Sequence, residues 1–103
     1  MLYLILASLI SVSVTPSVCL SPCNIRVILK VEPAKDNERV VLEVDGPDYY
    51  HRSDLDYTKY SVRTIQITYP NVPSGPYTVV ATLYKHDGKS WVAGMDTKRV
   101  IVK

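Results

Sequence analysis

Apolar and polar residues alternate along four stretches of the chain, at residues 25–31, 40–44, 64–69 and 77–83. The clearest is the last, in which Tyr77, Val79, Ala81 and Leu83 are separated by Thr or Val. Successive side chains of a strand point to opposite faces, so a period of two buries one set and exposes the other. Each stretch is therefore predicted to be a half-buried β-strand.

Turn-forming residues separate these strands. Pro, Gly, Asp and Asn concentrate between the alternating stretches and at 86–89, and they favour turns because they fix φ, tolerate positive φ or bond to nearby backbone. Two further extended stretches, 90–95 and 98–103, are interrupted near Gly94, which indicates a bulge. No helical period follows residue 20. The sequence thus predicts an all-β fold, with six to seven strands in two antiparallel sheets that face each other.

One corner carries a family resemblance. The segment Asn71-Val72-Pro73-Ser74-Gly75-Pro76-Tyr77, with the strand after it, resembles a corner of immunoglobulin-like (Ig-like) and fibronectin type III-like sandwiches. The resemblance implies that the Tyr77 hydroxyl bonds to nearby backbone, as in the tyrosine corner of those domains. Residues 25–103 are also similar to small secreted bacterial Ig-like domains. Unlike antibody domains, this chain has both cysteines before the first predicted strand, so its core is expected to be held by packing alone.

The first 20 residues differ from the rest. They contain no charged side chain, and residues 2–10 are nearly all apolar. This is typical of the apolar part of a signal peptide and too short to span a bilayer comfortably. We predict a signal segment at 1–20, cleaved near Ser17 to Ser21, and a domain at 21–103 that is secreted, periplasmic or part of the cell envelope, with no stable membrane span after cleavage. A first strand of the domain or an uncleaved anchor are the alternatives.

Cys19 and Cys23 are the only two cysteines. An even pair in an exported chain predicts a disulfide, although two free cysteines, or a pair partly removed with the signal segment, remain alternatives. A structural metal site needs more ligands than two thiolates, so we expect no metal at this pair and no cofactor.

Charge and size exclude some functions. The 103 residues carry a net charge of +2, with Lys and Arg interleaved with acids rather than gathered on one surface, so nucleic acid is not an expected partner. A domain this small has little core to support a catalytic cleft. His51 and Ser53 share a predicted strand face, but catalysis also needs an orienting carboxylate and an oxyanion hole, and we expect no enzyme. Four acids at 45–56 lack the spacing of an EF-hand.

The segment at 48–60 is the predicted contact loop for a protein partner. It combines Tyr49, Tyr50 and Tyr57 with Arg52, and Tyr and Arg are enriched where proteins bind one another. The competing hypothesis is a carbohydrate-binding module, in which Trp91 stands beside Tyr84 across the 86–89 turn as a platform for a sugar ring. The partner is thus expected to be an unidentified protein or glycan.

Overall fold

The fold was examined in a computed structural model that describes residues 9–34, 36–56, 63–86 and 88–103. Within these ranges, eight strands form two sheets, which confirms the predicted all-β class. The strands are β1 (Ile10–Thr15), β2 (Val18–Cys19), β3 (Cys23–Val31), β4 (Asn37–Asp45), β5 (Tyr50–Asp56), β6 (Thr64–Val72), β7 (Gly75–His86) and β8 (Ser90–Val102). No helix among the described residues is long and apolar enough to cross a membrane.

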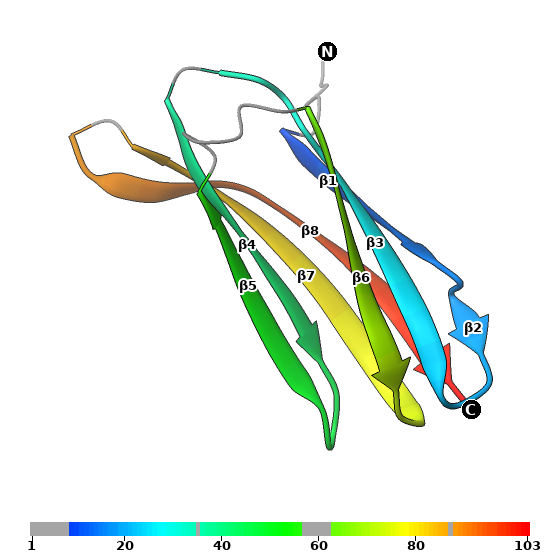
Figure 1. The fold of residues 1–103 in the computed structure, drawn as a ribbon. Helices are drawn as coiled ribbons and strands as arrows, with labels where there is room; N and C mark the ends of the chain where they lie inside the picture. Colours follow the sequence, from blue (N-terminus) through cyan, green and yellow to red (C-terminus); the bar gives the residue numbers. More distant parts are fainter. Residues whose placement is uncertain (1–8, 35, 57–62, 87) are drawn as a thin grey trace, which may run out of the picture.

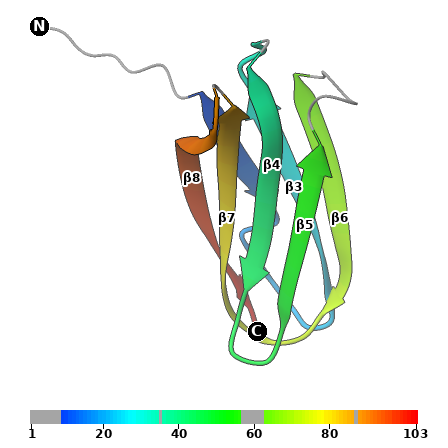
Figure 2. The same ribbon diagram turned by 90° about the vertical axis from the view of Figure 1, so that its left-hand side faces the viewer.

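The strands divide into a three-stranded sheet, in the order β1-β3-β6, and a five-stranded sheet, in the order β2-β8-β7-β4-β5. The two sheets lie face to face as two layers (Figures 1 and 2). All strand pairs are antiparallel except β2 and β8, which run parallel for two residues. The inward sets of β3, β4 and β7 supply most of the core, with Ile25, Val27, Leu29, Val40, Leu42, Val44, Tyr77, Val79, Ala81 and Leu83 all at most 2% exposed.

The fold begins inside the segment assigned to the signal peptide. β1 pairs along its whole length with β3, and it buries Ile10 and Val12 in the core while Ser13 stays exposed. On its other edge, the Val12 amide donates to the Asp96 carboxylate of β8 at 2.8 Å. β1 is therefore bound to both sheets, and the described domain starts before residue 21 because residues 10–14 alternate as a strand does. Cleavage between Ser17 and Ser21 would remove β1.

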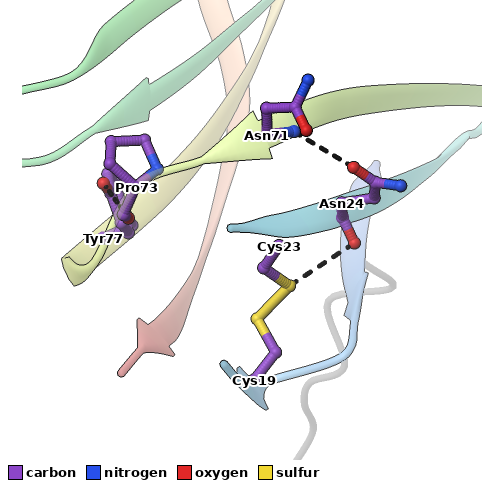
Figure 3. The surroundings of a disulfide bond; sticks show 6 residues. All are labelled: Cys19, Cys23, Asn24, Asn71, Pro73 and Tyr77. Atoms are coloured by element: carbon purple, nitrogen blue, oxygen red, sulfur yellow. Dashed lines mark hydrogen bonds between the residues drawn. A yellow bond between two sulfur atoms is a disulfide. The ribbon is translucent and has the colours of Figure 1, made fainter. Parts of the chain in front are cut away.

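The predicted disulfide between Cys19 and Cys23 is present. The expectation that packing alone holds the core is wrong, because Cys19 ends β2 of the five-stranded sheet and Cys23 begins β3 of the three-stranded sheet (Figure 3). The bond therefore joins the two sheets at one end of the sandwich. Sequence alone did not reveal this link, because two-residue β2 carries no periodic signal.

The corner before β7 has the contact that the family resemblance implies. The Tyr77 hydroxyl donates to the Pro73 carbonyl at 2.6 Å (Figure 3). Asn71 adopts φ 55° and Gly75 φ 152°, both in a region that Asn and Gly enter most easily. The Asn71 amide also donates to the Asn24 side chain at 3.0 Å, which ties the corner to β3. Tyr77, only 2% exposed, thus anchors the β6–β7 connection.

Candidate binding face of the five-stranded sheet

The predicted contact loop is largely an edge strand. Tyr50–Asp56 forms β5 and pairs with β4 from Asp45 to Arg39, while Tyr57 and Tyr60 lie outside the described residues. The polar sequence of β5 is compatible with a strand, because one face of the strand meets the other sheet and the other face is in contact with water. That inner face presents His51, Ser53 and Leu55, which pair with the buried Val44, Leu42 and Val40 of β4.

The structure separates the five predicted binding residues. Tyr49 is half-buried, and its ring packs edge-on against Tyr77, with the centroids 5.9 Å apart. Tyr50 and Arg52 lie on the outer face of β5. Trp91 pairs with Lys85 near the tip of the β7–β8 hairpin, at the opposite end of the sheet from Tyr50. Of the described members, only Tyr50 and Arg52 share one surface.

Around these two, a continuous array of polar contacts crosses the outer face of the sheet. The Tyr50 hydroxyl donates to Glu43 Oε2 at 2.5 Å, one strand inward. Arg52 Nε donates to Asp54 Oδ1 at 2.9 Å, and the other oxygen of Asp54 lies 3.8 Å from Arg39 Nη1. We call Tyr50, Glu43, Arg52, Asp54, Arg39 and Tyr84 the outer array.

The array ends in a stacking contact on β7. The Arg39 guanidinium carbon lies 4.4 Å from the centroid of the Tyr84 ring, within the range of a cation–π interaction. Arg39 and Tyr84 are also paired in register between β4 and β7. The array therefore links three neighbouring strands, β5, β4 and β7, with side chains that are exposed or half-buried and held in place by their neighbours.

Ionisation follows these contacts. The hydrogen bond to Glu43 raises the pKa of Tyr50 above its ordinary value, because loss of the hydroxyl proton would leave two negative charges together. The hydrogen bond from Arg52 lowers the pKa of Asp54, and the same contact raises the pKa of Arg52. At neutral pH the face thus presents a neutral phenol and fixed, alternating charges. Since these groups are solvent-exposed, the pairs order the surface more than they stabilise the fold.

Two residues at the centre of this face are covered by their neighbours. Val41 and Thr82 pair across β4 and β7 on the outer face, yet they are only 2% and 6% exposed. Asp54 of β5 and Met95 of β8 continue the same row on either side. Val41 is therefore covered although it lies at an outward position, whereas Ile101 of β8 is 49% exposed.

The residues considered for hydrolysis, His51 and Ser53, contact Tyr69 of the other sheet. The Ser53 and Tyr69 hydroxyls lie 3.2 Å apart, and the His51 ring packs against the Tyr69 ring with centroids 5.1 Å apart. Burial raises the pKa of Tyr69. These contacts join edge strand β5 to β6 of the other sheet.

The predicted side-by-side arrangement of Trp91 and Tyr84 is wrong. His86 pairs with Ser90, so only three residues separate the paired positions, and Tyr84 faces Val92 while Trp91 faces Lys85. A shift of one residue moves a side chain to the other face of a sheet. Trp91 and Tyr84 consequently lie on opposite faces of the hairpin and form no common platform.

Shallow hollows lie on the described surface, and two of them have the following lining. One, of about 400 Å³, is lined by Glu38, Arg39, Asp54, Leu55 and Asp56; the other, of about 340 Å³, lies over residues of β1, β3 and β6. No three His, Cys, Asp or Glu side chains within the described ranges are grouped so that they could hold a metal ion. No protein-family model matches the chain, and neither does any curated protein.

Sequence reasoning missed Glu43 and Arg39 as parts of this face. Both lie on β4 at outward positions, Arg39 directly before the buried Val40 and Glu43 between the buried Leu42 and Val44. The sequence shows that these residues alternate with buried ones. It does not show that β4 pairs with β5 on one side and with β7 on the other, because that depends on the order of strands in the sheet.

Proposed function

We propose that this chain is a non-catalytic Ig-like domain of the fibronectin III-like kind, which works outside the cytoplasm and binds a protein partner through the outer array. The order β8-β7-β4-β5 supports the family assignment, since Ig variable-type sandwiches extend their G-F-C sheet with a C′ strand in the same succession. The Tyr77 contact with Pro73 supports it from the corner.

The observation that carries the binding proposal is the order of the exposed outer array. Tyr50 is 56% exposed and its hydroxyl is already bonded, and the Arg52 and Asp54 side chains are about half exposed and paired with each other. A partner that docks on such a face immobilises few free side chains, so it loses less conformational entropy on binding. Tyr and Arg are also the residue types most often found at interface hot spots.

The alternating charges define the partner's chemistry. Glu43 and Asp54 alternate with Arg52 and Arg39 across the face, so a complementary partner carries both signs in matching positions. The hollow beside Arg39 and Asp54 is shallow, so this face suits another folded protein better than a small molecule, which needs a deeper concave site.

The location outside the cytoplasm is supported by the disulfide. Cys19 and Cys23 are bonded, and disulfides persist mainly in oxidising compartments. The uncharged N-terminal segment is consistent with export.

The test compares two double variants in affinity capture from the organism of origin, quantified by mass spectrometry. Tyr50→Ala with Arg52→Ala removes two members of the outer array. Arg26→Ala with Lys30→Ala is the matched control, because these exposed residues lie on the outer face of the three-stranded sheet. We expect one protein to be lost with the first variant and retained with the second.

Equal capture by both variants and the wild type would exclude the outer array as the binding site. A glycan array distinguishes the carbohydrate hypothesis from the protein hypothesis. Binding to a sugar that is lost on Trp91→Ala would show that the partner is a glycan and not a protein.

A further inference from the structure

The outer side of β5 is an open edge of the five-stranded sheet (Figure 1), and no described strand pairs with it. Proteins usually protect such edges with short strands, prolines, bulges or contacts that cover them. The other three sheet margins show such features: β2 has two residues, β6 contains Pro70, and the Val12 amide of β1 is bonded to Asp96. β5 instead runs for seven residues without a proline, and its pairing with β4 contains no register shift.

The backbone of β5 directs alternate residues to this open edge. The Gly46 amide donates to the Tyr49 carbonyl at 2.9 Å, which makes these residues a hydrogen-bonded pair at the start of the β4–β5 ladder. Hydrogen-bonded and non-hydrogen-bonded pairs alternate along an antiparallel ladder, so Tyr50, Arg52 and Asp54 direct their N–H and C=O groups away from β4. The hydrogen bonds of β8 to β2, counted inward across β7 and β4, give the same alternation.

The side chains of two of these residues carry opposite charges. Arg52 and Asp54 lie on the outer face and are in contact at 2.9 Å. Charged side chains on an edge strand normally discourage pairing, but this strand is complementary to a second copy of itself. When two copies pair antiparallel about Ser53, Arg52 of each copy lies opposite Asp54 of the other. Opposite charges in such positions favour pairing, whereas like charges oppose it.

The other registers lack this complementarity. Outward-directed backbone groups must meet outward-directed groups, so a two-fold pair is centred on a residue and not between two residues. A pair centred on Arg52 places two arginines opposite each other, and one centred on Asp54 places two aspartates opposite each other. Ser53 is also the midpoint of Tyr50–Asp56. The register that matches the charges is therefore the one that overlaps the whole strand.

We propose that this domain forms a two-fold dimer in which the β5 edges of two copies pair antiparallel about Ser53. Each Arg52–Asp54 pair exchanges two main-chain hydrogen bonds, and the four side chains form a square of alternating charges. The two five-stranded sheets become one continuous sheet, and a closed two-fold contact leaves neither β5 edge free. The inference goes beyond the proposed function and does not rest on it, because the main-chain edge of β5 forms the contact and both outer faces stay open.

Sedimentation equilibrium of the full chain measures the dimer. A contact through one strand pair is small, so we expect the dimer to appear between about 10 µM and 1 mM. Arg52→Asp or Asp54→Arg places like charges opposite each other, and each variant should raise the dimer Kd about tenfold or more. Arg26→Asp is the matched control, because it makes the same charge change at an exposed position of β3. We expect it to leave the Kd unchanged.

Mixing the two edge variants tests whether the charges face each other. Arg52→Asp has acids at both positions and Asp54→Arg has cations at both, so a heterodimer has opposite charges in every pair. We expect an equimolar mixture to associate about tenfold more tightly than either variant alone. Circular dichroism checks that each variant is folded, and the mixture leaves each folded chain as it was.

A cysteine at the centre of the pair tests the register. Two copies of Ser53 form a non-hydrogen-bonded pair, with Cα atoms about 4.5 Å apart, which a disulfide can bridge. We expect mild oxidation to cross-link Ser53→Cys. The matched variant His51→Cys should stay uncross-linked, because position 51 lies opposite Leu55 of the second copy. Intact-mass measurement without reductant checks that the Cys19–Cys23 bond is kept.

Four outcomes would overturn the proposal. A chain that stays monomeric at the highest concentration would leave the edge to another protein or to none. A dimer with the same Kd in both edge variants would use another surface, such as β6. A mixture that associates no more tightly than its components would mean that the charges do not face each other, and equal cross-linking of the two cysteine variants would mean that the pair has no fixed register.

Discussion

Substituting Gly46 by Ala tests whether the Tyr77 ring is fixed where the structure places it. Gly46 follows β4, and its backbone is outside the positive-φ region, so Ala fits the conformation. The obstacle is space: the added methyl would overlap Cδ1 and Cε1 of the Tyr77 ring and lie 3.2 Å from its Cζ. The substitution therefore acts through one side chain.

The Tyr77 ring has little room to withdraw. It is 2% exposed, its hydroxyl is bonded to Pro73, and Tyr49 packs against it. Forcing an extra methyl into a packed site costs about 1–3 kcal/mol, and displacing the ring also breaks a hydrogen bond worth about 1 kcal/mol. We expect Gly46→Ala to lower the free energy of unfolding by about 2–4 kcal/mol, or the Tm by about 10–25 °C for a domain of this size.

A double-mutant cycle measured by urea unfolding isolates the cause. Tyr77→Leu removes the ring atoms that meet the methyl, so Gly46→Ala in that background should be neutral or slightly stabilising, because Ala restricts the unfolded chain. Additive effects of Gly46→Ala and Tyr77→Leu would refute the steric contact. Tyr77→Phe, which removes only the hydroxyl, is expected to cost about 1 kcal/mol.

Three other contacts lead to separate predictions. Replacing Cys19 and Cys23 by Ser should lower the free energy of unfolding by about 2 kcal/mol, as expected for so short a loop, and adding reductant to the wild type should reproduce the loss in chemical denaturation. Lys85 lowers the pKa of Asp36 below 3.8; the stabilisation relative to Asp36→Asn should therefore be complete above that pH and disappear as the pH falls through the lowered value, which thermal melts across pH 2–6 would show. Asp96→Ala should cost about 1.5 kcal/mol or more, since the β1 amide loses a charged acceptor, and hydrogen exchange at β1 should rise more than at β4; uniform exchange would contradict the bond.

Much of the fold was predictable because single strands carry their own period. The inward sets of β3, β4, β6 and β7 follow the alternation seen in the sequence. The bulge expected near Gly94 also coincides with a register shift, where Leu83 and Tyr84 pair with Gly94 and Val92 and leave Ala93 without a partner of its own. These features are local, so a sequence window contains the information for them.

The candidate binding face was less predictable because it is assembled across strands. Tyr50 and Arg52 were predicted as binding residues from their residue types. The contacts that hold them in place also involve Glu43 and Arg39 of β4, which lie beside them because β4 pairs with β5. In the β7–β8 hairpin, a difference of one residue in the pairing register decides which side chains share a face. Pairing of His86 with Ser90, rather than of Lys85 with Ser90, moves Trp91 away from Tyr84, and no residue type in the turn fixes that choice uniquely.

The N-terminal region shows that composition and period can give opposite indications. Averaged over residues 1–20, the sequence is uncharged and apolar, which favours a signal segment. Residue by residue, Ile10, Val12 and Val14 alternate with Ser11 and Ser13, and β1 uses that alternation against β3. A boundary after residue 20 would also separate the two bonded cysteines, so removal of residues 1–20 and an intact disulfide exclude each other. A domain that keeps its disulfide therefore keeps Cys19, and unless cleavage falls between β1 and that cysteine, it also keeps the strand that leads from the hairpin tip into the core.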